Sequence, residues 1–572
     1  MPGRLSVRMS SMYNVAAAAA AALLLAATAP ALLPLSSAAA AAAAAHTFEG
    51  RLVTFSHIGD AGHGQSGNVP GGRPEARDWA LVDPTTNALV HKFARGFMPP
   101  ARDRNQRRIS PGAQVAMSCV SFDPVTGLCT AVAPGDAYLI SGPTPPAASA
   151  RKVQKILVMR LDFSSCGYKA TTMTDTDIKT LYLGPNMDAN GGHAQAFEDC
   201  SYGALRIDAS TFTIRTITVS ACTATCDFYG ITMPSDAAAR AQLGFDIYAV
   251  YTNMVYLLPD NYFSLCGWSG MATIPGNQVI LHSAPNYAGI YSRMTVLQEH
   301  LHNFLVWHSY RFDFVYQDPS TCMAQTPVCP SAADLHRLGW ATPATGGEAL
   351  AAASLPPGAV KAFNLPASYL TGTGSFIRIK TDWTSFYNNT AYGKNIYVSV
   401  RVAKRSDSAL EPNQAGKVLV HHLYAAINNA FPADSSDPYL NYLMAVAPNS
   451  AGTATDFKLV VIAGSWVGTD IMTVGVCRYI TSAAECPTSI PAAIPPRPPT
   501  PPPPPSPPPP RPSPPSPSPP SPKPPAPPSP PPSPSPPPSP SPPPPSPRPP
   551  SPRPPSPPPP PKGKKGRRLL LH

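Results

Sequence analysis

A tract of proline and serine near the carboxyl end limits the fold of this chain more than any other feature. From Pro495 to Pro561 nearly every residue is Pro or Ser, and the 572 residues include 79 prolines. Proline fixes φ and has no amide hydrogen to donate, so such a tract forms neither helix nor sheet. We expect residues 488–572 to extend as a polyproline II stalk at roughly 3.1 Å per residue, closed by a basic run at 562–568. The alternative, a ligand for proline-reading domains, belongs to cytosolic signalling.

The first 45 residues have the pattern of a secretory signal peptide. Arg4 and Arg8 precede a long run of alanine and leucine that ends in small residues, as in exported precursors. An uncleaved membrane anchor is the alternative, but Pro30 and Pro34 interrupt the run and alanine is only weakly apolar. We therefore expect a secreted protein with no stable membrane span after signal cleavage.

Between these ends, the apolar pattern divides the chain into three folded segments. Residues 46–150 contain short alternating runs such as 50–55 and 80–82, which indicate a β-rich domain. Residues 151–345 contain longer apolar runs at 153–161, 245–251 and 278–281, typical of buried strands in an α/β sheet. In residues 346–487 alternation returns at 375–380, 396–402 and 457–462, so we expect an antiparallel β-domain there.

The amino-terminal β-rich domain is most simply interpreted as a propeptide of a secreted enzyme. The cluster Arg104–Arg108 is a candidate processing site, although basic clusters are more often solvated loops. The carboxyl-terminal β-domain has two possible roles, substrate or matrix binding and structural support of the segment before it. An Asn388-Asn389-Thr390 glycosylation acceptor in it is compatible with secretion.

Eleven cysteines indicate disulfide bonds, since an exported chain folds under oxidising conditions. Proximity in the sequence favours the pairs Cys119–Cys129, Cys322–Cys329 and Cys477–Cys486, and the odd count leaves one cysteine unpaired. For the Cys222–Cys226 motif a disulfide is preferred to a zinc site, because no second pair stands at ligand spacing.

The segment Leu297–His308 carries the strongest signal for chemistry. Residues four apart share a helix face, so a helix here projects Gln298 and His302 together, with Glu299 beside them. Two ligands fixed on one face are what zinc hydrolases use. The first ligand would be an amide oxygen, which is neutral and less basic than imidazole, so zinc or another divalent metal is expected.

The neighbouring residues supply the remaining parts of such a site. Glu299 stands where a general base would take a proton from a metal-activated water. His308 becomes a third ligand if the helix ends after His302 and the chain turns at Leu305, where a positive φ costs on the order of 1 kcal/mol. His300 points to another face. The alternative is an amphipathic helix with incidental histidines.

Residues downstream favour the metal site. Tyr316, Asp318 and Ser320 precede Met323, at a plausible distance for the methionine turn of a metzincin, and Leu338-Gly339-Trp340 follows. Together with His302-Asn303-Phe304 and His308, this order resembles the gametolysin family of volvocine algal matrix metalloproteases. Upstream, Cys200–Gly203 and Cys266–Gly270 also look like segments of that family, so the resemblance covers roughly residues 150–345.

The resemblance implies a zincin-like α/β (α+β) catalytic domain at 151–345, flanked by the two β-rich domains. It implies zinc at Gln298, His302 and His308, Glu299 as catalytic base and Met323 in the methionine turn. It also implies hydroxyproline-rich wall or matrix glycoproteins as substrates. The chain departs from the family pattern at Gln298, which replaces histidine in a variant known in the family, and at Leu305, which replaces glycine.

The formal net charge of +11 suits an acidic matrix polysaccharide as a further partner. Nucleic acid is excluded as a partner because no aromatic residues interleave the basic ones and no nucleic-acid motif is present. Two hypotheses follow. The first is a secreted metalloendopeptidase, favoured by Glu299 and the methionine segment. The second is a structural wall glycoprotein whose protease-like module has lost its metal, favoured by Gln298 and Leu305.

Overall fold

The structure is a computed structural model that describes residues 46–59, 77–144, 152–285, 288–324 and 326–490. These residues belong to one compact unit, Met1–Ala493. The expected signal peptide and nearly all of the expected polyproline stalk lie outside the described residues. Within the described ranges, no helix is both long enough and apolar enough to cross a membrane.

The sheet next to the candidate site has the strand order β11-β9-β12-β14-β13. Strands β11, β9, β12 and β14 are parallel, and β13 is antiparallel to β14. The bounds are β9 Ile156–Asp162, β11 Thr213–Thr218, β12 Asn253–Leu257, β13 Trp268–Ile274 and β14 Gln278–Leu281. Strands β12, β13 and β14 are buried along their whole length, as expected for strands covered on both faces.

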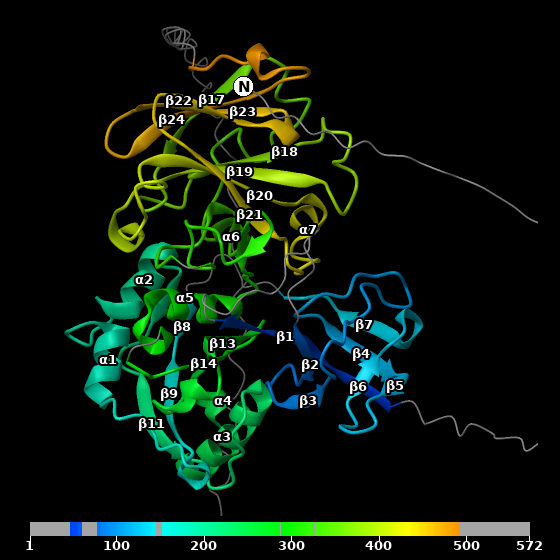
Figure 1. Ribbon diagram of the computed structural model, residues 1–572, viewed down its shortest axis with the longest axis vertical. Coiled ribbons are helices and arrows are strands. Elements are labelled where there is room, and N and C mark those ends of the chain that lie inside the picture. The colour runs from blue at the N-terminus through cyan, green and yellow to red at the C-terminus, as the bar shows by residue number, and fades with distance from the viewer. Residues whose placement is uncertain (1–45, 60–76, 145–151, 286–287, 325, 491–572) are drawn as a thin grey trace, which may run out of the picture. The chain divides into compact units, whose positions relative to one another are not determined.

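Helices cover the two faces of this sheet (Figure 1). Side chains of α1, α2 and α5 share a core with one face, and those of α3 and α4 share a core with the other. The bounds are α1 Asp175–Leu183, α2 Gly192–Cys200, α3 Phe228–Leu243, α4 Ile247–Val250 and α5 Arg293–His302. A short pair, β8 Lys152–Gln154 and β10 Leu205–Ile207, lies beside it. The expected α/β fold is therefore confirmed.

The strand expected at 245–251 is wrong. The Asp246 side chain accepts a hydrogen bond from the Tyr248 backbone nitrogen and begins the short helix α4, because an aspartate at this position satisfies an otherwise unpaired amide. The strand of this region is β12, which starts at Asn253. The other runs, at 153–161 and 278–281, are strands as expected.

The amino-terminal residues continue the same sheet through β1, β2 and β3. The second half of β1 pairs with β13 and β2, and its first half pairs with β4. Phe55 of β1 stacks on Phe228 of α3, with ring centroids 4.7 Å apart, so β1 contributes to the core of the neighbouring sheet. The bounds are β1 His46–Gly59, β2 Asp78–Val82, β3 Leu89–Lys92, β4 Gln114–Cys119, β5 Ser121–Phe122, β6 Cys129–Ala131 and β7 Ala137–Ser141.

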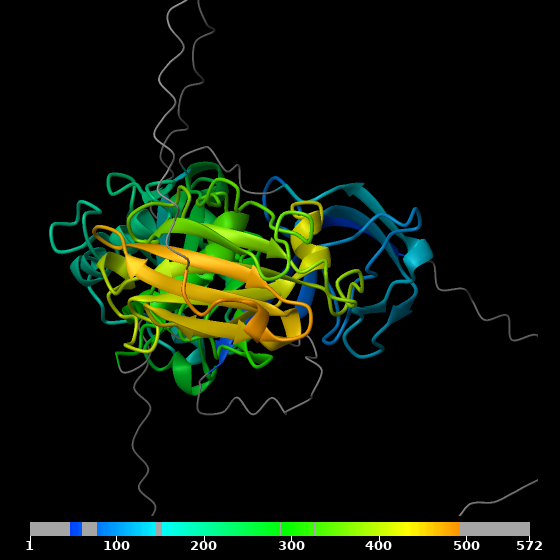
Figure 2. The same cartoon turned by 90° about the horizontal axis from the view of Figure 1, so that it is seen from above.

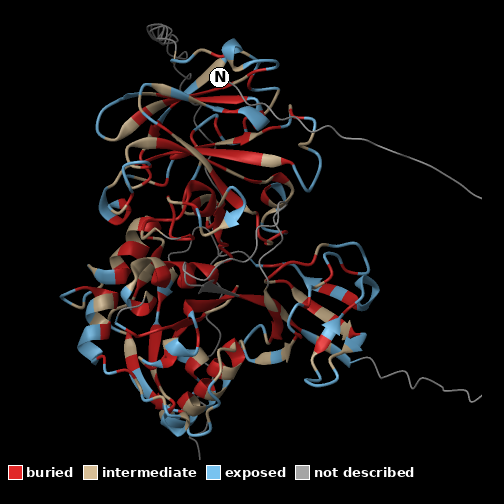
Figure 3. Cartoon of the chain, viewed as in Figure 1, coloured by how far each residue is buried: buried red, intermediate tan, exposed pale blue. Residues whose placement is uncertain are grey.

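Two further sheets enclose a common apolar core (Figure 2). Most of their strands come from residues 360–478, and two short strands come from residues 309–315, directly after His308. Their strand orders are β16-β15-β21-β20-β19-β18 and β17-β24-β23-β22, and buried residues follow the strands of both (Figure 3). The bounds are β15 Ser309–Arg311, β16 Phe314–Val315, β17 Val360–Pro366, β18 Phe376–Lys380, β19 Lys394–Arg401, β20 Lys417–Tyr424, β21 Leu440–Val446, β22 Ser450–Ala454, β23 Leu459–Trp466 and β24 Ile471–Arg478, with α6 Ala332–Arg337 and α7 Ala425–Ala430.

Five disulfides bond ten of the cysteines. The predicted pairs Cys119–Cys129 and Cys477–Cys486 are confirmed. The predicted pair Cys322–Cys329 is wrong, because Cys329 bonds Cys200 from α2 and leaves Cys322 as a buried free thiol. Cys222 and Cys226 are in disulfides as expected, with Cys166 and Cys266 as their partners. The free cysteine is thus shielded from intermolecular pairing.

Candidate active site

Helix α5 presents the candidate ligands, and local contacts define both of its ends. Ser292 caps the first turn by accepting a hydrogen bond from the Thr295 backbone nitrogen. At the other end, the Leu305 nitrogen donates to the His302 carbonyl and the Val306 nitrogen donates to the Leu301 carbonyl. This pair of bonds is a Schellman motif, which requires a left-handed residue after the helix. Leu305 takes that role with a φ of 66°, so the chain turns where the sequence predicts.

The turn brings His308 back to His302. Their Nε2 atoms lie 3.0 Å apart. The Nδ1 of His302 lies 2.8 Å from the Val306 carbonyl oxygen, which can only accept, so Nδ1 carries the proton and Nε2 of neutral His302 keeps its lone pair. Tyr316 packs on His308 with ring centroids 4.4 Å apart.

The Gln298 amide points its oxygen at the same place. Its nitrogen donates to the backbone oxygens of Cys322 (2.8 Å) and Ala324 (3.3 Å), in the orientation assigned from the hydrogen-bond network. Its oxygen then lies 2.9 Å from Nε2 of His308. Two carbonyls therefore hold the amide with its oxygen turned toward His308, as outer contacts hold the ligands of metal sites.

These three groups fit a metal ion. Ligand atoms of a tetrahedral zinc with bonds of about 2.0–2.1 Å are roughly 3.3 Å apart, and Nε2 of His308 lies at 3.0 Å and 2.9 Å from the other two candidate ligand atoms. Among the described residues, no three His, Cys, Asp or Glu side chains gather as metal ligands. The amide of Gln298 is consequently essential to this candidate site.

Glu299 is fully buried beside β13. A Cβ on Gly270 would approach Cγ of Glu299 to 2.8 Å and its Oε1 to 2.9 Å, closer than such contacts normally come. Glycine at 270 therefore leaves the space in which the Glu299 carboxylate lies. His300, by contrast, hydrogen-bonds the Val296 carbonyl and packs on Phe197, on the face away from the candidate ligands, as expected.

The residues around Met323, from Asp318 to Cys329, lie against the same site and are called the methionine segment here. Met323 is buried between Cys322 and Ala324, whose carbonyls hold Gln298. The Met323 carbonyl accepts a hydrogen bond from the Ser309 nitrogen (2.9 Å), directly after His308. The residues that follow His308 and those around Met323 are thus joined by backbone contact.

Two polar groups from the carboxyl-terminal sheets hold this segment, and the sequence did not identify either. His421 of β20 contacts Asp318 (3.1 Å) and Ser320 (3.2 Å). Burial raises the pKa of Asp318, but His421 and the hydroxyls of Ser309 and Ser320 hold that pKa below its ordinary value. Asp318 is therefore an ionised acceptor that fixes the start of the segment.

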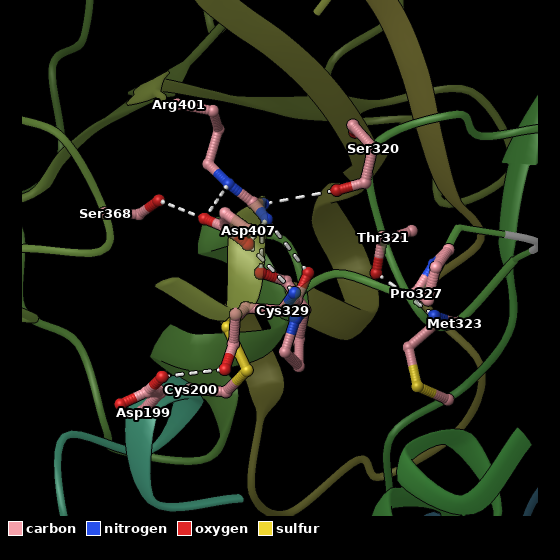
Figure 4. Close-up of polar contacts among 12 residues, drawn as sticks. Asp199, Cys200, Ser320, Thr321, Met323, Pro327, Cys329, Ser368, Arg401 and Asp407 are labelled. Carbon is pink, nitrogen blue, oxygen red and sulfur yellow. Dashed lines mark hydrogen bonds and ion pairs between the residues drawn. A yellow bond between two sulfur atoms is a disulfide. The ribbon is translucent and has the colours of Figure 1, made fainter. Parts of the chain in front are cut away.

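The second group is the buried ion pair of Arg401 and Asp407, 2.5 Å apart (Figure 4). Arg401 donates to the carbonyls of Ser320 (3.2 Å) and Cys329 (3.1 Å), on either side of Met323. Asp407 accepts from the Cys329 nitrogen (2.9 Å), and Cys329 is bonded to Cys200. A strand of the carboxyl-terminal sheets thus clamps both ends of the methionine segment.

The comparison with protein families agrees with this geometry. Residues 155–455 match the model of the gametolysin peptidase M11 family. The chain belongs to that family. The match extends beyond the catalytic sheet into the carboxyl-terminal strands, which is the region joined by Arg401 and His421. A search of curated proteins finds no match.

M11 membership places this chain in a metallopeptidase family and implies a zinc-dependent peptidase, and the resemblance seen in the sequence is confirmed. The five disulfides are consistent with a secreted protein. Gln298, His302 and His308 are the described residues whose donor atoms fit the zinc that the family implies.

Proposed function

We propose that this chain is a secreted endopeptidase whose metal is held by Gln298, His302 and His308. The observation that supports this most strongly is the orientation of the Gln298 amide, which two backbone carbonyls turn toward Nε2 of His308. In this orientation the amide oxygen accepts a hydrogen bond from Nε2 of His308, so a metal ion bound here would take the place of that hydrogen bond. Zinc is the expected metal, and the neutral amide admits another divalent ion.

The roles of the protein groups follow from their positions. A zinc ion at this site would lower the pKa of a water molecule and polarise the scissile carbonyl. Glu299 accepts the proton of the attacking water and passes it to the leaving amine. The bond from Nδ1 of His302 to Val306 keeps Nε2 free to bind the metal. The hydrogen bonds from the Gln298 nitrogen to the carbonyls of Cys322 and Ala324 restrain the amide oxygen, which is the remaining ligand.

Hydroxyproline-rich glycoproteins of a wall or extracellular matrix are the proposed substrates. The family supports a protein substrate, and the chain's own Pro/Ser tract has the composition of such glycoproteins. The tract would place the enzyme in the same matrix that it cleaves. The second candidate function, a protease-like module of a structural glycoprotein, is favoured by the single observation that the site has only two histidines among its ligands.

The test compares the secreted protein with a Glu299→Ala variant, before and after processing near Arg108. We expect about one zinc per chain in both proteins, as in mononuclear sites, and cleavage of hydroxyproline-rich glycoprotein by the parent alone. A chelator should abolish that cleavage. Absence of zinc from both proteins, with no cleavage after processing, would establish the structural module instead.

A further inference from the structure

A cavity of about 270 Å³ lies among α6, β18 and α7, in a region that the proposed peptidase chemistry does not use. Arg337 ends α6, and Arg378 and Lys380 stand two residues apart on β18. None of the described residues that line the cavity is acidic. A cavity with three cationic side chains and no carboxylate in its lining favours an anion.

Arg337 supplies an independent observation. Its side chain is only 7% exposed, and its Nη1 and Nη2 have no hydrogen-bond partner among the described residues. The guanidinium lies over the ring of Phe431, 4.3 Å from its centroid, and Phe431 also lines the cavity. A buried charge without a hydrogen-bonded partner is costly, so this arginine needs an acceptor that the described side chains do not provide.

The three carboxylates that act on Arg337 are engaged elsewhere. Asp334 accepts from the Ser331 hydroxyl (2.9 Å), Asp437 pairs with Arg77 (2.6 Å) and Asp434 pairs with Arg108 (2.6 Å). Burial lowers the pKa of Arg337 despite the opposing effect of these acids. The attraction of Asp334, Asp437 and Asp434 therefore does not offset the desolvation of the guanidinium.

The other two cationic side chains of the cavity, Arg378 and Lys380, differ in how firmly they are held. Arg378 donates to the side-chain oxygens of Asn428 (2.9 Å) and Asn429, so its guanidinium has a fixed position. Lys380 is half-buried and makes no side-chain ion pair with a described residue. Burial, together with Arg378 and Arg337, lowers the pKa of His336 to about 4, so the positive charge at neutral pH comes from the arginines and the lysine.

We propose that this cavity binds an oxyanion, the sulfate or carboxylate group of an acidic polysaccharide. Guanidinium and ammonium groups recognise such groups by charge-assisted hydrogen bonds. The cavity lies just below the size range of pockets for drug-sized ligands, about 300–1,000 Å³, which suits one charged sugar unit. The carboxyl-terminal sheets would then attach the enzyme to acidic matrix, whether or not the metal site is active.

The test uses calorimetric titration of the full secreted chain with three probes: sodium sulfate, glucuronate and a sulfated disaccharide. The variant is Lys380→Ala, whose half-buried side chain can be removed without opening the core. The matched control is Lys417→Ala, which removes one charge from the far end of the same sheet. There the backbone of Lys417 in β20 lies opposite that of Arg401 in β19. Circular dichroism confirms that both variants are folded.

We expect one saccharide per chain for the parent and for Lys417→Ala, with binding about tenfold weaker in Lys380→Ala, the factor for one charge-assisted hydrogen bond. Tighter binding of either saccharide than of sulfate identifies the polysaccharide as the source. Equal binding of free sulfate identifies a free oxyanion and overturns the polysaccharide assignment. Absence of binding, or equal affinity in Lys380→Ala and Lys417→Ala, overturns the site.

Discussion

At the residue scale, Leu305 shows how a leucine can replace the glycine that a left-handed turn usually requires. Its backbone φ of 66° is strained for any residue that has a Cβ. The side chain is 3% exposed and packs with Ile274 and Trp307 in a small apolar cluster. Burial of a leucine contributes about 1.5–3 kcal/mol, which exceeds the strain. The sequence predicts the turn from the histidine spacing, but the cluster that stabilises it comes from residues distant in the chain.

Replacing Leu305 with glycine is expected to destabilise the protein. The variant gains about 1 kcal/mol from relief of strain and loses the buried side chain, so the free energy of unfolding should fall by about 0.5–2 kcal/mol. Denaturant unfolding monitored by tryptophan fluorescence measures this. Leu305→Met, which keeps both the strain and the burial, is the control. A Leu305→Gly protein more stable than the parent would show that the strain dominates.

At the element scale, the site is built by two sets of elements. Helix α5 supplies Gln298, Glu299 and His302, and helical spacing makes these predictable from the sequence. The methionine segment, by contrast, is held by β19 and β20. Alternation along β19 places Arg401 on the same face as Asn395, Tyr397 and Ser399, which suggests solvent exposure. That face is instead covered by α6 and the methionine segment, and no local pattern could show this.

Replacing Arg401 with methionine should disturb the methionine segment and the metal site together. Asp407 would remain buried without its partner, which costs about 3–5 kcal/mol in the free energy of unfolding. Denaturant unfolding gives that energy, and zinc affinity should fall as well because the segment carries the carbonyls that hold Gln298. The control is Arg206→Met, which removes a partly exposed ion pair with Glu198 and should cost about 0–1 kcal/mol. A loss no larger than that of Arg206→Met would contradict the clamp.

At the scale of the whole molecule, the described segments are joined more closely than composition suggests. Strand β1 pairs with β13, next to the helix that bears Glu299, and contributes Phe55 to the core there. Arg108 also pairs with Asp434 at 2.6 Å. Apolar patterns predict that each segment is rich in strands, because alternation is local. They do not predict pairing between strands separated by about two hundred residues, which depends on the assembled fold.

Cleavage of the chain between Thr144 and Lys152 should leave the two fragments associated. A specific protease site inserted there, followed by gel filtration, tests this, because the β1 and β13 pairing and the shared core should survive the cut. Release of the amino-terminal fragment under native conditions would contradict the expectation. Peptidase activity that appears only on such release would support the propeptide interpretation of residues 46–150.

The most direct test of the proposed site is the zinc affinity of Gln298 variants, measured by competition with a chromophoric chelator. The proposal predicts one zinc per parent chain, affinity weakened on the order of tenfold or more in Gln298→Ala, and affinity strengthened in Gln298→His, where imidazole replaces the amide. His302→Ala should lose the metal. A parent chain that binds no zinc, or a Gln298→Ala protein that binds it as tightly as the parent, would contradict the role of the amide as a ligand.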